Sequence, residues 1–204
     1  MAKVALAPMQ VQVRQEKYFP NQEVIQEASD YLIEKELKGA HFLLSPPLFL
    51  KKHKRVPPYS LWHSCDLKSA RIVLPHDFII LPEIKCFELR RYEIEDPLER
   101  SLQGFTHIKP LYYDVQIYIR IIDLTSAEPS LAMQEHLKWE IPVSLAQAQS
   151  DDLIENWRGT SFNGTGIASA LVKVCQEISL RCQSRVDEAW SRRLPFSRLA
   201  KPSS

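Results

Sequence analysis

The stretch YDVQIYIRI occupies residues 113–121 and decides the fold. Its apolar residues alternate with polar ones, which is the pattern of a strand that buries one face. After a short polar connection a second alternation runs to residue 143. Its apolar positions are Leu131, Met133, Leu137, Trp139, Ile141 and Val143, and its polar positions are Gln134, His136, Lys138 and Glu140. The two runs predict a long antiparallel hairpin over residues 113–143, whose apolar face must pack against other elements.

The elements before this hairpin predict a parallel pair of strands. Residues 4–13 have the pattern of a first strand, and a helix follows from a cap at Asn21 to a C-terminal cap at Gly39. Its expected apolar side consists of Val24, Ile25, Ala28, Tyr31, Leu32 and Leu37, and its polar side of Glu27, Asp30, Glu34 and Lys35. A second strand at residues 40–44 completes the unit, for which a right-handed parallel connection is expected.

The remaining elements complete one sheet and its cover. Residues 78–81 predict a strand buried on both faces, with a bulge or a change of environment farther on. Pro82 then marks an edge, a bulge or a strand end, because proline cannot donate to a ladder. A short helix is expected at residues 152–157 and a long closing helix at 166–190. The closing helix carries an apolar stripe of Ile167, Leu171, Val174, Ile178, Cys182 and Val186.

The fold class predicted is therefore α/β (α+β), with a single mixed β-sheet that contains a long antiparallel hairpin and is covered by two principal helices. The 204 residues contain no linker-like stretch. One domain is expected over residues 1–190, followed by a basic, flexible C-terminal tail at 191–204 that includes Arg192, Arg193, Arg198 and Lys201.

Composition excludes several functional classes. A formal net charge of +1 gives no global attraction to nucleic acid or to a membrane surface, and no nucleic-acid partner is expected. No apolar run approaches the ~20 residues that span a bilayer, so the chain as given is expected to be soluble. Because residues 3–9 already have the pattern of a core strand, the sequence leaves open whether a leader or a lipid anchor precedes them.

The four cysteines do not form a metal-binding or disulfide framework. Cys175 and Cys182 lie on one predicted helix, too far apart to be bridged, and are expected to be small core residues. Whether Cys65 and Cys86 pair depends on the fold. No metal site and no cofactor are predicted.

Two segments are candidates for binding a partner or an anion. The first is the basic run Lys51, Lys52, Lys54 and Arg55. It suits phosphate, acidic lipid headgroups or an acidic partner, and it also has the composition of an ordinary solvated loop. The second is the turn Asn163, Gly164, Thr165 and Gly166 at the start of the closing helix. Exposed N–H groups and the helix dipole favour an anion there, although the spacing matches no nucleotide-binding motif.

Catalysis is not expected. His63, Cys65 and Asp66 are the one tight group of reactive residue types. Residues two apart on a helix point in different directions, so His63 is poorly placed to activate Cys65. The catalytic set is therefore predicted to be empty.

The element order resembles the periplasmic domain of a group of outer-membrane lipoproteins. The group includes the curli secretion channel protein, lipoprotein activators of penicillin-binding proteins, and auxiliary lipoproteins of envelope ABC transporters and polysaccharide exporters. The matching features are VALAP at 4–8, HDFIILPEI at 76–84, the strands at 115–124 and 131–139, and the helix at 166–190. Two features depart from the group: SAEP at 126–129 stands where a glycine-containing turn is common, and the lipid-bearing cysteine is absent.

Two functions follow from these observations. The resemblance implies a non-enzymatic envelope adaptor or assembly protein, which binds another envelope protein or itself through an exposed sheet edge, the basic loop or the long connection at residues 93–110. Such a protein is periplasmic and associated with the outer membrane, with membrane contact only through a lipid anchor not present in this sequence. The alternative is a small cytoplasmic α/β enzyme or anion-binding protein, which uses the helix N-terminus at Asn163–Gly166 and either His63 or His76 as an acid or base. The sequence identifies neither the partner nor the oligomeric state.

Overall fold

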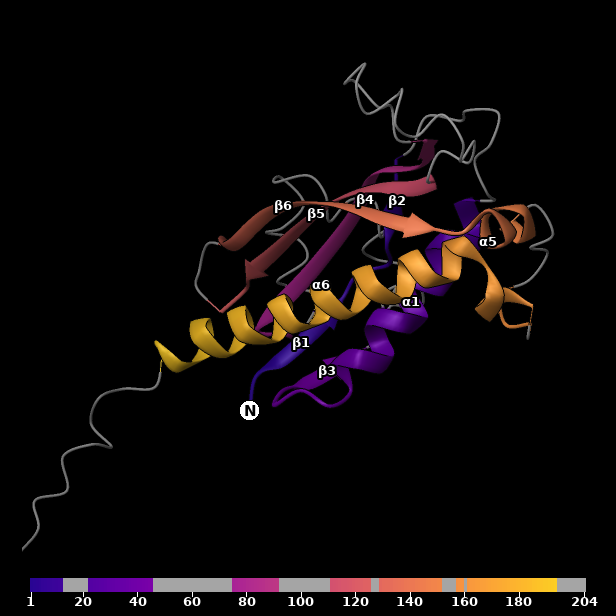
Figure 1. Ribbon diagram of the computed structural model, residues 1–204. Coiled ribbons are helices and arrows are strands. Elements are labelled where there is room, and N and C mark those ends of the chain that lie inside the picture. Colours follow the sequence, from indigo (N-terminus) through magenta and orange to yellow (C-terminus); the bar gives the residue numbers. More distant parts are fainter. Residues whose placement is uncertain are drawn as a thin grey trace, which may run out of the picture.

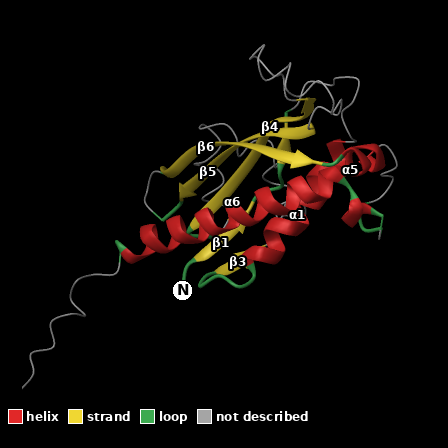
Figure 2. Ribbon diagram, viewed as in Figure 1, coloured by secondary structure: helices red, strands yellow, loops and turns green. Residues whose placement is uncertain are grey.

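The structure is a computed structural model that describes residues 1–12, 22–45, 75–91, 111–125, 129–151, 157–159 and 161–193. It is an α+β fold in which α1 and α6 cover one face of a mixed sheet (Figures 1 and 2). The elements are β1 (Lys3–Leu6), β2 (Gln10–Val11), α1 (Gln22–Leu37), β3 (Leu43–Ser45), β4 (Phe78–Arg91), β5 (Leu111–Asp123), β6 (Ser130–Val143), α5 (Leu145–Ser150), the 3-10 helix η3 (Phe162–Gly164) and α6 (Gly166–Ser191).

The sheet has the strand order β3-β1-β4-β5-β6, and β2 also pairs with β4. β1 is parallel to both β3 and β4, which confirms the predicted parallel pair. β5 is antiparallel to both β4 and β6, and its pairing with β6 confirms the hairpin. The irregularity predicted after Pro82 is a register shift between Ile84 and Cys86.

The first strand is not the single element that was predicted for residues 4–13. It ends at Leu6 and resumes as β2 at Gln10. A carboxylate of α1 fills the break, because the backbone N–H of Met9 donates to Asp30 Oδ1 over 2.5 Å. The prediction that Asp30 faces solvent is therefore wrong, and its side chain is buried. Tyr31, expected in the core, is half exposed, and Ile33 is buried instead.

Pro82 lies beside this break. The carbonyl of Ile80 accepts from the N–H of Ala7, and the carbonyl of Ile84 accepts from the N–H of Gln12. Backbone groups of alternate strand residues point to the same side, so the nitrogen of Pro82 faces the gap between β1 and β2. Proline is tolerated inside this long strand because no ladder hydrogen bond is required of it there.

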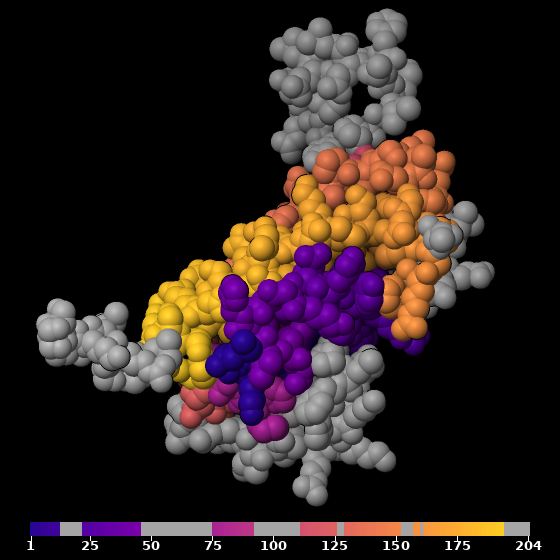
Figure 3. All heavy atoms as spheres, turned by 90° about the horizontal axis from the view of Figure 1, so that it is seen from below, coloured from indigo at the N-terminus to yellow at the C-terminus, as the bar shows by residue number. Residues whose placement is uncertain are grey.

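The helices form one layer over the sheet, and seen from below α6 and α1 lie side by side (Figure 3). The whole predicted stripe of α6 is buried, as are both of its cysteines. Gly39 follows α1, as predicted, but its φ is not positive, so it is not a left-handed cap. The short helix predicted at 152–157 falls mostly outside the described residues, and a helix that was not predicted, α5, begins at Leu145 and ends at Ser150.

The C-terminal end of α6 is attached to the sheet. Arg193 forms an ion pair with Asp123, and its guanidinium lies 4.9 Å from the centre of the Phe78 ring. Phe78 also packs edge-on against Trp190, at 6.5 Å between ring centres. A flexible tail was expected from residue 191 onward, but residues 191–193 belong to the end of α6 and its contacts with the sheet. Residues 194–204 lie outside the described part of the chain.

Candidate functional site

The two segments predicted to bind anions have different outcomes. Lys51, Lys52, Lys54 and Arg55 lie outside the described residues. The turn Asn163–Gly166 is described, and Thr165 is the N-cap of α6, accepting from the N–H of Ala168 over 3.1 Å. The next amide is already bound as well, because the N–H of Ile167 donates to Asp151 Oδ1 over 3.0 Å.

The carboxylate of Asp151 therefore occupies the position that an external anion would take. Its second oxygen accepts from the hydroxyl of Tyr113 over 2.5 Å. A Cβ added at Gly166 would lie 2.9 Å from that same oxygen, so the glycine is needed for close packing. Asn163 is exposed and lines a hollow of about 420 Å³ with Tyr31 and Trp157. The protein supplies its own negative charge at this helix end.

Of the two candidate acid–base residues only His76 is described, and it is not brought to this turn. His63 lies outside the described residues, and His76 hydrogen-bonds to Ser45 Oγ at 2.7 Å. His76 lies two residues before Phe78, which packs against Trp190 at the opposite end of α6 from Gly166. Within the described part of the chain no three His, Cys, Asp or Glu side chains are grouped so as to hold a metal ion.

The described cysteines are free and buried, and Cys65 lies outside the described residues. Burial raises the pKa of Cys86 to about 11 and the pKa of Cys175 and Cys182 to about 12. At neutral pH these thiols are protonated, and a protonated thiol is a poor nucleophile.

The most prominent feature that could bind a partner is the outer edge of β6. β6 has 14 residues and pairs with β5 on one side, and no described strand pairs with its other side. Near Pro82 the even-numbered residues of β4 direct their backbone N–H and C=O groups toward β1 and β2. The pairing registers of β4 with β5 and of β5 with β6 then determine which backbone groups of β6 point toward β5 and which point outward. The even-numbered residues 134–142 direct their backbone groups outward.

Two features limit indiscriminate pairing at this edge. Pro142 is one of the outward-directed residues, so it presents a carbonyl but no N–H. The side chains of Gln134, His136, Lys138 and Glu140 are exposed on the face opposite the helices. His136 stacks on Tyr118 of β5, with 4.3 Å between ring centres and 8° between the planes. The open edge is therefore polar and structurally ordered.

Three carboxylates form a row across this outer face. Glu88 is opposite Asp114, and Asp114 is opposite Glu140. Asp114 is only 1% exposed and is stabilised by Arg90 at 3.3 Å and by Lys138 at 4.0 Å. Arg90 also binds Glu88 at 2.7 Å. Glu140, at the outer end of the row, has no cationic partner among the described residues. It lies directly opposite the carboxylate of Asp114, and like charges in such a position destabilise a sheet.

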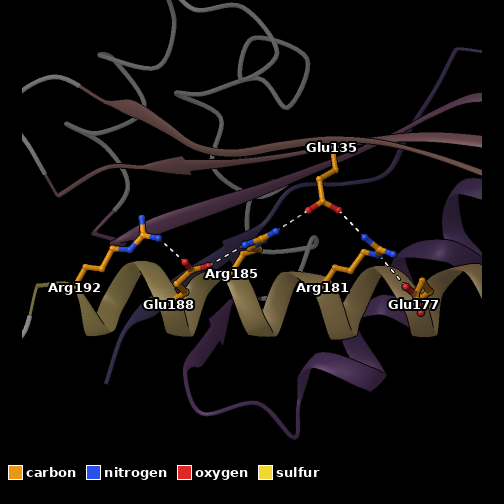
Figure 4. Close-up of polar contacts among 6 residues, drawn as sticks. All are labelled: Glu135, Glu177, Arg181, Arg185, Glu188 and Arg192. Carbon is orange, nitrogen blue, oxygen red and sulfur yellow. Dashed lines mark hydrogen bonds and ion pairs between the residues drawn. The ribbon is translucent and has the colours of Figure 1, made fainter.

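The helix-facing side of the same strand is held by ion pairs (Figure 4). Glu135 binds Arg181 at 3.0 Å and Arg185 at 3.5 Å, and both arginines come from α6. The network continues through Glu177 at one end, and through Glu188 and Arg192 at the other. Hydrogen bonding to Arg185 lowers the pKa of Glu188, which keeps that carboxylate charged.

A groove of about 250 Å³ runs beside this network. Four consecutive residues of β6 line it, Ala132 to Glu135, together with three residues of α6 and its C-cap Arg192. The groove therefore lies between the start of β6 and the C-terminal end of α6.

We expect Glu135→Gln to lower the free energy of unfolding by about 0.5–1 kcal/mol at low salt, because the carboxylate is shared by two partly exposed arginines. In about 1 M salt the difference should nearly disappear. Urea denaturation at both salt concentrations measures it. Glu34→Gln, which removes the single exposed pair with Lys38, is the control and should cost about 0.3 kcal/mol. A loss for Glu135→Gln that does not depend on salt would show that the network acts through packing instead.

Sequence reasoning expected an exposed sheet edge but did not say which strand forms it. It also missed Asp30, Asp114 and Asp151 as structural carboxylates. For Asp114 a signal was present, since Arg90 and Lys138 lie on the two strands that flank it. Asp30 accepts from the backbone amide of Met9, and Asp151 accepts from the backbone amide of Ile167 and the hydroxyl of Tyr113. The residue pattern carries no sign of these contacts between separate segments.

Comparisons with known proteins show the fold. Neither known protein families nor curated proteins include a match to this sequence. Among solved structures, the hypothetical protein CT253 from Chlamydia trachomatis is similar with a TM-score of 0.64 and 19% identity, over 91% of this chain and 97% of that one. This likeness establishes the α+β fold and nothing about activity.

Two further structures are more distantly similar. Lipoprotein GNA1162 from Neisseria meningitidis has a TM-score of 0.47 and 8% identity, over 73% of this chain and 91% of that one. Protein XCC0632 from Xanthomonas campestris has a TM-score of 0.45 and 8% identity, over 93% of this chain and 88% of that one. At these TM-scores neither likeness bears on function. No described helix of this chain is long and apolar enough to cross a membrane.

Proposed function

We propose that this protein is a non-enzymatic adaptor or assembly protein of the cell envelope, which binds an extended segment of another envelope protein, or of itself, along the open edge of β6. The observation that carries the proposal is the 14-residue edge strand whose outer side is unpaired within the described part of the chain. An extended segment added to such an edge gains main-chain hydrogen bonds, and alternate side-chain positions give specificity.

The rigidity of the edge supports this role. Glu135 connects the middle of β6 to two arginines of α6, and His136 stacks on Tyr118 of the neighbouring strand. A strand held in its extended conformation before binding loses little conformational entropy when a partner pairs with it. The buried, protonated thiols and the carboxylates used in structural contacts are consistent with binding in place of catalysis.

The compartment is proposed from the element order of the sequence. Strand, crossover helix, strand, a further strand, long hairpin and closing helix follow one another as in the periplasmic lipoprotein domains that the sequence resembles. We infer a periplasmic protein, associated with the outer membrane, that acts in export or in the building of the cell wall or outer membrane.

A photoreactive benzoylphenylalanine placed at position 136 in cells tests the edge directly. We expect it to crosslink to a discrete partner, because residue 136 is exposed and its backbone faces outward. The same group at position 176, an exposed site on α6, is the matched control and should give little product. Equal crosslinking at both positions, or none at 136, would contradict the proposal.

The same cells test the compartment. Fractionation should recover the crosslinked product with the envelope, and the gene sequence upstream of Met1 should encode a hydrophobic leader that ends in a lipid-bearing cysteine. Recovery in the cytosol together with the lack of any leader would refute the envelope location, even if the edge binds a partner.

A further inference from the structure

We propose that the partner at this edge is a second copy of the chain, and that the two β6 strands pair antiparallel about a two-fold axis beside Trp139. The inference deepens the proposed function, on which it rests, by naming the partner. It is argued from the charges, the backbone directions and the apolar side chains of one short segment.

The charges on the outer face complement themselves about this axis. Lys138 and Glu140 lie on the same face of β6, on either side of Trp139. A two-fold axis beside Trp139 places Lys138 opposite the partner's Glu140, and Glu140 opposite the partner's Lys138. Glu140 thereby gains the cation that it lacks among the described residues. The row of carboxylates formed by Glu88, Asp114 and Glu140 ends at a positive charge.

The backbone directions agree with this register. Lys138 and Glu140 both direct their N–H and C=O groups outward, so the two ion pairs fall at hydrogen-bonded positions of the new ladder. Trp139 falls at a non-hydrogen-bonded position, where opposite side chains approach most closely. The ladder spans residues 135–143 of each strand. Pro142 then lies opposite the partner's His136 in the outermost hydrogen-bonded pair, so the ladder loses one N–H donor at each of its two ends.

On the helix-facing side of β6, the same register buries apolar side chains that are partly exposed in the single chain. Leu137 and Trp139 are only half-buried in the single chain. In the pair, Leu137 lies opposite the partner's Ile141, and the two Trp139 rings meet at the axis. Contacts between aromatic side chains across strands are among the more stabilising cross-strand pairs.

Neighbouring registers lack these advantages. An axis at Lys138 places two lysines opposite each other. An axis at Leu137 pairs His136 with the partner's Lys138 and leaves Glu140 opposite the partner's Gln134. Of these registers, only the axis at Trp139 pairs both charges with opposite charges.

Sedimentation equilibrium on the purified chain tests the inference with charge-reversed variants. The wild type should form dimers. Glu140→Lys should weaken self-association by roughly tenfold or more, because two attractive pairs become two lysine pairs. Lys138→Glu should do the same through two glutamate pairs. A mixture of the two variants should form a heterodimer with affinity close to that of the wild type, because every pair is then attractive again.

Thermal unfolding shows whether the variants fold. Lys138→Glu places a carboxylate beside Asp114 and can destabilise the chain, whereas Glu140→Lys places a cation opposite Asp114 and should not. If Lys138→Glu does not fold, the self-association of Glu140→Lys alone tests the inference. A monomeric wild type, a Glu140→Lys dimer of unchanged affinity, or no heterodimer from two folded variants would overturn the inference.

The crosslinking at position 136 separates this inference from the proposed function. A monomeric wild type that still crosslinks there to a different envelope protein refutes the second copy and keeps the docking edge. A monomeric wild type without any crosslink refutes both.

Discussion

Phe78→Ala is expected to lower the free energy of unfolding by about 3–5 kcal/mol, because it removes a fully buried ring and leaves a cavity. Phe78 is the first residue of the central strand β4, and its ring contacts both Trp190 and the guanidinium of Arg193. Its loss should therefore also loosen the C-terminal end of α6 from the sheet. Urea denaturation measures the first effect, and faster amide hydrogen exchange near Trp190 measures the second.

Leu180→Ala is the matched control for this variant. It removes a large apolar side chain from α6, the helix that Phe78 contacts through Trp190, but Leu180 is 63% exposed, so the change should stay within about 0.5 kcal/mol. If both variants lost the same stability, the assignment of Phe78 to the core would be wrong.

Gly166→Val is expected to cost about 2–4 kcal/mol, through overpacking and the loss of hydrogen bonds. An added Cβ would lie 2.9 Å from Asp151 Oδ2 and 3.1 Å from Cε2 of Tyr113. The carboxylate would have to move away from the N–H of Ile167 and from the hydroxyl of Tyr113. Denaturation measures the loss of stability, and near-ultraviolet circular dichroism should report the change around Tyr113.

Gly164→Val provides the comparison within the same turn. A Cβ at Gly164 meets nothing within 4 Å, so this variant should lose less than about 1 kcal/mol. Equal losses at the two glycines would mean that the turn is sensitive to backbone stiffening and that the close packing at Gly166 is not the cause.

The hairpin and the helices could be predicted because their signals are local. Val115, Ile117, Ile119 and Ile121 alternate with polar residues, and one face of such a strand must be buried whatever covers it. The apolar residues from Ile167 to Val186 recur at helical spacing, so one side of that helix must also be buried. These patterns decide which residues are buried without any knowledge of the partner elements.

The remaining features depend on contacts between distant segments. The break between β1 and β2 exists because Asp30 of α1 binds the N–H of Met9, and nothing near Met9 in the sequence signals it. β6 lies at the outside of the described sheet because β1 pairs with β3 and β4, and β6 pairs with β5 alone. An exposed sheet edge could be expected from the sequence, but not assigned to a strand, since strand order is set by long-range pairing.

The two edges of the sheet are very unequal. Among the described strands, β3 ends the sheet on one side with three residues, whereas β6 ends it on the other with fourteen. Stacking of many copies edge to edge requires two compatible edges on each copy, one to receive and one to offer. A chain with one long edge and one stub can pair once and then has no comparable edge left for the next copy. The inequality of these two edges opposes growth into fibrils.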